Sequence, residues 1–158
     1  EKFERNKDQQ EVVKDEGMSF TQIDFAKHDG WSFENKTIFN TLMQCVGQYA
    51  NDCKIKQVWP KTQGYESLRI KRYFPDGKDE FTEHVDVMDY ATAKRFLVLF
   101  LYLTDNDEGQ TVFPEQNFTS QCKQGNVLIF PPLWPWQHAG RKPIETPKYI
   151  VGSYLHYI

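Results

Sequence analysis

The chain has 158 residues, which is enough for one domain with a buried core, and we expect a single domain over residues 1–158. Aromatic residues, which favour strands and line pockets, make up 15% of it. The formal charge of −3 provides no general attraction to nucleic acid or to an anionic membrane. The longest apolar run, Phe96 to Leu103, is too short to cross a bilayer, so we expect neither a membrane nor a nucleic-acid partner.

The cysteines favour a reducing compartment. Cys45, Cys53 and Cys122 are odd in number and lack the spacing of a metal site. We interpret them as free thiols, which predicts a cytoplasmic location. No signal peptide is visible, but the chain begins at Glu1, and a trimmed N-terminus could have carried one.

The first part of the chain, about residues 1–60, is expected to be mainly helical. Residues 1–16 are highly charged with few apolar anchors, which predicts a surface helix that frays at its start. Residues 17–32 predict a loop or a short edge strand. The clearest helix spans residues 33–52, because its apolar residues recur on one face. This stripe consists of Ile38, Leu42, Cys45, Val46 and Tyr49.

From residue 66 onward the pattern becomes that of strands. Residues 66–74 alternate with a period of two, and the strand expected at 81–86 should pair with them or lie beside them. Residues 95–103 form an apolar run typical of a strand buried on both faces. Shorter strands are expected at 110–113, 126–130, 134–139 and 147–157. Six or seven strands behind a helical region predict a mainly β fold, a small antiparallel barrel or jelly roll with its core at about 66–158.

The segment from Phe81 to Asp86 contains the first candidate ligands of a metal. On a strand, residues i and i+2 point to the same side, so His84 and Asp86 would present an imidazole and a carboxylate together. His138, on another expected strand, is a third candidate. Two imidazoles and one carboxylate form a facial triad, which holds a ferrous ion and leaves three positions open for substrates. A His-x-Asp triplet alone is more often a solvated strand face, so the interpretation depends on its partners.

Lys148 is the partner that suggests an anionic ligand. It opens an otherwise apolar strand, where a lysine is unfavourable unless it meets an anion. Residues 140–147 are rich in turn formers, so we expect a hairpin that places Lys148 beside His138. The alternative is a lysine that extends to solvent at a strand end. Together with the triad, Lys148 favours a ligand whose carboxylate it binds while the same ligand chelates the metal.

These residues resemble the 2-oxoglutarate- and iron(II)-dependent dioxygenases, and within them the prolyl 4-hydroxylase-like branch. The resemblance covers about residues 66–158, and the basic residue ten positions after the distal histidine is lysine, as in prolyl 4-hydroxylases. Its implied fold is a double-stranded β-helix, or jelly roll, with the N-terminal helical region packed on it. Four pieces carry it: Tyr73, His84-Val85-Asp86, the segment from Leu101 to Pro114, and residues 123–130 before His138.

The resemblance implies roles for individual residues. His84, Asp86 and His138 would ligate Fe(II), and Lys148, helped by Tyr102, would bind the distal carboxylate of 2-oxoglutarate. Tyr73 would face the same pocket. The implied reaction uses O2 to hydroxylate a peptidyl proline and converts 2-oxoglutarate to succinate and CO2, and ascorbate is expected as a further requirement. The implied partner is a peptide or protein that contains proline.

Departures from the family pattern fall at the expected substrate contacts. Phe81 stands where a tyrosine is common, and Tyr154 stands where many prolyl hydroxylases have tryptophan. These two, with Arg95, occupy positions at which that branch contacts its peptide. Trp134 and Trp136 would share a strand face, where they either form an aromatic wall for substrate, Trp136 in particular, or pack outward.

Three alternatives stay open from the sequence. One is hydroxylation of another side chain or of a small molecule, and another is a non-catalytic jelly-roll binding module. A nucleic-acid demethylase is disfavoured by the net negative charge and by Lys148, because those enzymes have arginine at that position. A local basic stretch that includes Arg69, Lys71 and Arg72 keeps it in consideration.

Overall fold

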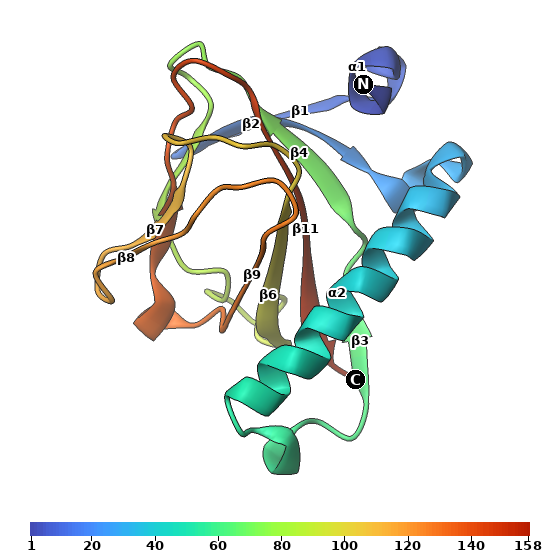
Figure 1. Cartoon of the computed structure of the whole chain (residues 1–158), viewed down its shortest axis with the longest axis vertical. Coiled ribbons are helices and arrows are strands. Elements are labelled where there is room, and N and C mark those ends of the chain that lie inside the picture. The colour runs from blue at the N-terminus through green and yellow to red at the C-terminus, as the bar shows by residue number, and fades with distance from the viewer.

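The computed structural model describes residues 1–158 and is mainly β, with one long helix against a strongly curled antiparallel sheet (Figure 1). The long helix is α2 (Ser32–Asp52), and α1 (Lys2–Arg5) is a single short turn near the N-terminus. The strands are β1 (Glu11–Asp15), β2 (Met18–Asp24), β3 (Gln63–Tyr65), β4 (Arg69–Tyr73), β5 (Glu80–His84), β6 (Arg95–Tyr102), β7 (Thr111–Phe113), β8 (Phe118–Thr119), β9 (Val127–Phe130), β10 (His138–Gly140) and β11 (Lys148–Tyr157).

The sheet has eleven strands, more than the six or seven expected. Its main path runs in the order β8-β7-β10-β5-β2-β4-β11-β6-β9, while β1 pairs with β2 and β3 pairs with β11. Neighbours on this path are mostly distant in sequence, as in a jelly roll rather than a meander. The expected fold class is therefore confirmed.

Two apolar clusters occupy the two sides of the sheet. Leu97 and Leu99 of β6 join Leu42 and Val46 of α2 in the cluster between sheet and helix. The alternate residues of the same strand, such as Val98, belong to an aromatic-rich cluster inside the curl of the sheet. The prediction that this strand is buried on both faces is confirmed, and the second cluster walls the interior that holds the candidate site.

Helix α2 lies across the outer face of the sheet, as Figure 1 shows. Its predicted apolar stripe is confirmed at Leu42 and Val46, which are buried, while Ile38 and Tyr49 pack at the edge of the same cluster. A search of the helices for one long and apolar enough to cross a bilayer finds none.

The N-terminal third differs from the expected helical region. Residues 1–16 do not form one helix, because α1 ends at Arg5 and β1 follows at Glu11–Asp15. The expected loop or edge strand at 17–32 is instead β2, which pairs with β1, β4 and β5 in the interior of the sheet. Apolar side chains on both faces of β2 suit a position in the interior of the sheet, because Phe20 packs in the inner cluster and Ile23 in the outer one.

Two further expectations about strands are wrong. The strands at 66–74 and 81–86 are not neighbours, because β2 lies between β4 and β5. Residues 134–139 are not one strand either. Pro135 lies in a 3-10 turn over Trp134–Trp136, and β10 begins only at His138. The two tryptophans therefore do not share a strand face.

The expected hairpin between the strands of His138 and Lys148 is also wrong. Strand β10 pairs with β5 and β7, whereas β11 pairs with β3, β4 and β6. The two strands instead face the same cavity, where a β-carbon added at Gly140 of β10 would lie 3.6 Å from Nζ of Lys148. Curling of the sheet brings these residues together across the interior, and direct pairing does not.

Candidate metal centre and co-substrate cavity

Two adjacent strands and the loop after one of them supply the three candidate ligands. His84 ends β5, His138 begins β10, and the two residues are register partners in this strand pair. Asp86 lies two residues beyond the end of β5, so it does not share a strand face with His84 as expected. The amide of Asp86 donates a hydrogen bond of 3.1 Å to the carbonyl of Pro132, which fixes this loop.

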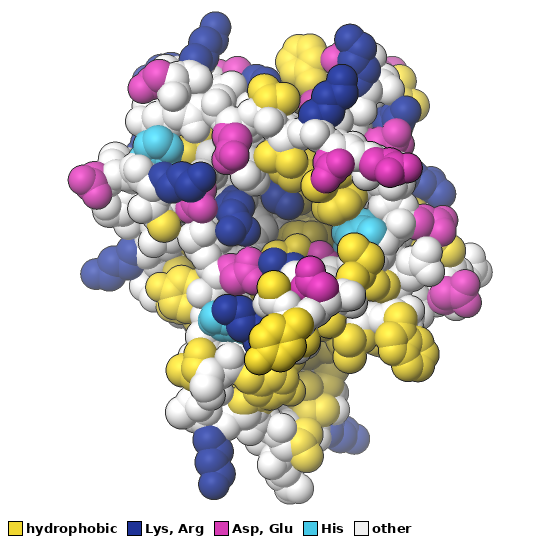
Figure 2. Space-filling view, turned by 180° about the vertical axis from the view of Figure 1, so that it is seen from behind, with side chains coloured by type: hydrophobic (Ala, Val, Ile, Leu, Met, Phe, Trp, Pro, Cys, Tyr) yellow, Lys and Arg dark blue, Asp and Glu magenta, His cyan; other side chains and the backbone are white.

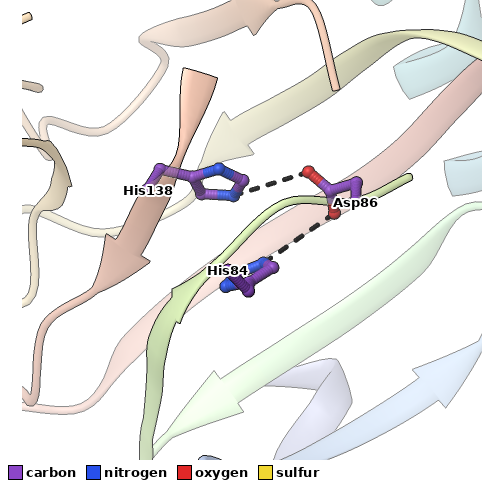
Figure 3. A group of neighbouring side chains, drawn as sticks. All are labelled: His84, Asp86 and His138. Atoms are coloured by element: carbon purple, nitrogen blue, oxygen red, sulfur yellow. Dashed lines mark ion pairs between the residues drawn. The ribbon is translucent and has the colours of Figure 1, made fainter. Parts of the chain in front are cut away.

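The side chains of His84, Asp86 and His138 converge on one point (Figure 3). One ligand atom from each lies within 4.8 Å of the other two. Nε2 of His138 is 3.5 Å from Oδ2 of Asp86, and Nε2 of His84 is 3.9 Å from Oδ1. Two nitrogens and a carboxylate at this spacing match the ligands of a non-haem iron centre.

Backbone hydrogen bonds orient both imidazoles. Nδ1 of His84 lies 2.8 Å from the carbonyl of Thr82, and Nδ1 of His138 lies 3.0 Å from the carbonyl of Trp136. Because a carbonyl only accepts, each Nδ1 must carry the proton, and each Nε2 presents its lone pair to the centre.

The environment keeps both imidazoles neutral. Burial lowers the pKa of His84, and the neighbouring His138 lowers it further. Burial also lowers the pKa of His138, although the carboxylate of Asp86 opposes this shift. A neutral imidazole is the form that binds a metal, so both rings are suited to ligation near neutral pH.

Unsatisfied buried atoms support a cation at this centre. Oδ1 of Asp86 accepts a hydrogen bond of 2.6 Å from the hydroxyl of Tyr154, but Oδ2 has no partner, and neither does Nε2 of His138. Buried polar atoms without a partner are rare in native proteins and carry a free-energy penalty. A divalent cation between the three side chains would satisfy both atoms, so the residues fit iron(II).

Arg95 and Tyr154, predicted to contact substrate, are engaged in holding Asp86. Arg95 binds Glu66 through two hydrogen bonds of 2.6 and 3.0 Å, and it donates a third, of 3.0 Å, to the carbonyl of Asp86. Its guanidinium lies 3.9 Å from the centroid of the Tyr154 ring. Burial and the nearby carboxylate of Asp86 raise the pKa of Tyr154 well above its ordinary value, so its hydroxyl stays a donor.

A cavity extends from the three side chains to Lys148. Lys148 is only 2% exposed, and its Nζ lies 4.3 Å from the centroid of the Tyr73 ring. Burial lowers the pKa of Lys148 to about 8, so the amine is charged at neutral pH. On the face opposite α2, Figure 2 shows a hollow near the centre with Lys or Arg side chains inside it. The lining residues are Lys71, Tyr73, Phe81, His84, Asp86, Phe100, Thr111, His138, Gly140, Lys148, Ile150 and Tyr154.

Tyr102, predicted to help bind a carboxylate, lies behind the cavity wall. Its ring is fully buried, and its hydroxyl makes hydrogen bonds of 2.8 Å with Oγ1 of Thr111 and with Oγ of Ser120. Thr111 does line the cavity. The structure thus places Thr111 between Tyr102 and any ligand.

The other two predicted substrate contacts lie in different surroundings. Phe81 lines the cavity and stacks on His84, with ring centroids 3.6 Å apart and an angle of 10° between the planes. Trp136 is partly buried and packs against Phe113 at 6.3 Å, outside the cavity lining. Trp134 is exposed to solvent.

Sequence reasoning missed Lys71 and Thr111. In the sequence Lys71 stands out only as part of a local basic stretch, yet it lines the cavity. The period-two alternation of β4 puts Lys71 on the same face as Tyr73, but it does not show which face lies inside. Thr111 stands on a three-residue strand, where no pattern distinguishes the inner face.

Comparison with known proteins agrees with this geometry. The profile of the 2OG-Fe(II) oxygenase superfamily matches residues 68–156. A search of curated protein sequences finds no match. The viral collagen prolyl hydroxylase of Paramecium Bursaria Chlorella virus-1, solved with 2OG, is similar at a TM-score of 0.69 and 21% identity, over 88% of this chain and 80% of that one.

Two further solved structures share the fold. A Pseudomonas putida prolyl-4-hydroxylase has a TM-score of 0.67 and 13% identity, over 99% of this chain and 82% of that one. A Trichoplax adhaerens prolyl hydroxylase, solved with a hypoxia inducible factor peptide fragment, has a TM-score of 0.50 and 19% identity, over 59% of this chain and 44% of that one. With a family profile over more than half of its length, and with the donor set in place, the chain belongs to the 2OG-Fe(II) oxygenase superfamily.

Proposed function

We propose that this oxygenase hydroxylates a proline residue in a peptide or protein. The observation that carries the proposal is one cavity that joins the converging set of His84, Asp86 and His138 to the buried and unpaired Lys148. This arrangement suits a co-substrate that chelates a metal at one end and has a carboxylate at the other. Membership of the superfamily implies Fe(II), 2-oxoglutarate and O2 as its reagents.

His84, Asp86 and His138 would hold the iron. When bound, iron(II) would activate O2 and couple the oxidation of 2-oxoglutarate to succinate and CO2 with hydroxylation of a C–H bond. The protein keeps both Nε2 atoms deprotonated through the Thr82 and Trp136 carbonyls. Tyr154 and Arg95 hold the Asp86 carboxylate in the orientation that leaves Oδ2 free.

Lys148 would bind the distal carboxylate of 2-oxoglutarate. An ammonium–carboxylate pair is stronger inside a protein than at its surface, and here the carboxylate would give the buried Lys148 ammonium an ionic partner. The Thr111 hydroxyl, held by Tyr102, would donate a second hydrogen bond to the same ligand, and Tyr73 would pack on it.

The choice of proline as the substrate is supported only by similarity of fold. The similar solved structures are prolyl hydroxylases, and one of them was solved with a peptide fragment. A second candidate function is hydroxylation of another side chain or of a small molecule. Phe81 favours it, because this residue stacks on His84 at the cavity wall without the hydroxyl that the branch commonly has there.

The oxygenase chemistry is tested by succinate formation from 2-oxoglutarate with iron(II), in the presence and absence of ascorbate. Asp86→Ala should reduce the rate by at least about 100-fold, because it removes a ligand, and even the loss of a residue that only orients a ligand lowers metal affinity or activity by about 10- to 100-fold. Asp15→Ala, on the exposed strand β1, is the matched control and should retain full activity. An unchanged rate in Asp86→Ala would refute the metal centre.

The substrate is tested by mass spectrometry of proline-containing peptides incubated with the enzyme. A gain of one oxygen on proline supports the proposal. A gain on another residue, or succinate formation without any modified peptide while a small molecule is oxidised, supports the second candidate. Ascorbate dependence would show as sustained turnover only when ascorbate is present.

A further inference from the structure

The cavity contains a second cation, the half-buried Lys71, that the proposed function leaves unused. Lys71 lies near the middle of β4, points into the cavity, and has its Nζ 4.5 Å from the ring centroid of Phe20 and 6.0 Å from that of Phe81. No carboxylate lies within ion-pair or hydrogen-bonding distance of it, and the same is true of Lys148. Two unpaired ammonium groups in one cavity carry a free-energy penalty until anions neutralise them.

The other two basic residues of β4 both have acidic partners, so the lack of a partner is particular to Lys71. Arg69, on the same face, lies 3.5 Å from Asp24 and 3.6 Å from Glu66. Arg72, on the opposite face, lies 2.8 Å from Glu4. Of the three basic residues in this strand, only Lys71 has no acidic partner within the protein.

The register of β4 and β11 places Lys71 between the two ends of the cavity. Lys148 is the partner of Tyr73, and Ile150 is the partner of Lys71. Tyr154, whose hydroxyl holds Asp86, follows on the same side of β11. Two residues advance a strand by about 6.8 Å, a spacing comparable to the length of an extended five-carbon dicarboxylate. Lys71 therefore lies along the path from Lys148 to the metal ligands.

The electrostatic influence of Lys71 agrees with this central position. Burial is the main cause of the lowered pKa of Lys148, and the charge of Lys71 lowers it further. An anion placed between the two ammonium groups would relieve this repulsion.

We propose that Lys71 binds the metal-side carboxylate of 2-oxoglutarate, so that the two lysines of the cavity neutralise the two carboxylates of the co-substrate. This inference rests on the proposed function for the identity of the ligand. It assigns to Lys71 the end of the ligand next to His84 and Asp86, while Lys148 holds the distal end. The site thus selects a dicarboxylate through one cation for each end.

The test compares two ligands in the iron(II)-loaded protein without O2, with binding measured by isothermal titration calorimetry. 2-Oxoglutarate has both carboxylates, whereas 2-oxopentanoate has the same chain length but lacks the distal one. Lys71→Met and Lys148→Met remove one cation each at nearly constant volume. Lys71→Arg retains the charge, and Lys14→Met, on exposed β1, is the matched control.

Both cavity variants should bind 2-oxoglutarate roughly 10- to 100-fold more weakly, the effect of losing a hydrogen bond to a charged group. With 2-oxopentanoate, Lys148→Met should bind as well as wild type, whereas Lys71→Met should still bind about tenfold more weakly. Lys71→Arg should recover part of the affinity, which separates loss of charge from a folding defect.

Other outcomes would overturn the inference in distinguishable ways. If Lys71→Met binds both ligands like wild type, Lys71 does not contact the co-substrate. If Lys71→Met weakens 2-oxoglutarate alone, both lysines serve the distal carboxylate. If the wild-type protein binds neither ligand, the proposed function itself fails.

Discussion

The carboxylate of Asp86 depends on two side chains that the sequence analysis assigned to substrate. Tyr154 donates to Oδ1 of Asp86 at 2.6 Å, and Arg95 donates to its backbone carbonyl at 3.0 Å. Because Asp86 lies in the loop after β5, no strand pairing fixes its side chain. These two residues therefore supply the rigidity that a metal ligand requires.

Removing the Tyr154 hydroxyl should weaken metal binding without removing a ligand. In Tyr154→Phe, Asp86 loses its hydrogen bond, and we expect affinity for iron(II) or manganese(II) to fall about 10- to 100-fold, the usual effect of losing a residue that orients a metal ligand. Titration of the metal-free protein measures this. Tyr157→Phe, at the exposed end of the same strand, should bind metal like wild type. Equal affinities in the two variants would show that Tyr154 does not orient Asp86.

At the scale of elements, the placement of β2 connects the N-terminal hairpin to the metal centre. Gly17 forms the turn between β1 and β2, and its carbonyl accepts a hydrogen bond of 2.7 Å from the amide of Thr82 in β5. The carbonyl of Thr82 in turn accepts from Nδ1 of His84. The β1–β2 hairpin, where the sequence predicts a helix followed by a loop or a short edge strand, therefore supports a candidate iron ligand.

Gly17→Ala should destabilise the protein more than Gly77→Ala does. Both glycines have a positive φ, +78° and +75°, so both substitutions force alanine into a left-handed conformation at a cost of about 1–2 kcal/mol. At Gly17 the new β-carbon would also overlap with Oγ1 of Thr82, whereas at Gly77 no atom lies within 4 Å of the new β-carbon. Urea unfolding of the two variants isolates this contact, and equal losses of stability would show that the turn relaxes freely.

At the scale of the whole molecule, the interior of the curled sheet contains two lysine ammonium groups, those of Lys71 and Lys148, without an acidic partner. Burial lowers the pKa of Lys148 from 10.5 to about 8, and burial lowers that of Lys71 to about 8 although Asp86 opposes the shift. Between about pH 8 and 10 the unfolded chain therefore binds more protons than the folded one. The contribution of these lysines to the free energy of unfolding must rise with pH across this window.

Lys148→Met should unfold at a higher urea concentration than wild type near pH 7 when no ligand is present. The advantage should shrink as the pH rises from about 8 to 10, because the wild-type amine then becomes neutral in the folded state. Saturating 2-oxoglutarate should reverse the order, since the ligand stabilises the charged wild-type cavity. A constant difference between the two proteins at every pH would contradict the buried charge.

The histidines predict a loss of stability at acidic pH. Burial lowers the pKa of His84 and of His138 below 6.5, so the unfolded chain takes up protons that the folded one resists. As the pH falls below about 6.5, the free energy of unfolding of the metal-free protein should decrease. Replacing both histidines with glutamine should flatten this part of the pH profile. An unchanged profile in that variant would assign the acid sensitivity to other groups.

Local patterns in the sequence were enough to predict the helix at 33–52, the buried strand at 95–103 and the three side chains that converge in the structure. Leu42 and Val46 recur at a helical spacing, and the run at β6 is apolar at every position, so these short-range patterns suffice. The three side chains could be proposed as ligands because His84 and Asp86 lie two residues apart, because His138 supplies the second imidazole, and because Lys148 suggests an anionic ligand beside them.

Which residues share the cavity could be learned only from the folded chain. The insertion of β2 between β4 and β5, and the meeting of β10 and β11 across the interior, are non-local pairings that no local pattern encodes. The inward direction of Lys71 has the same origin. Alternation shows which residues share a face, but only the closed sheet shows which face lies inside, because burial depends on segments that are distant along the chain.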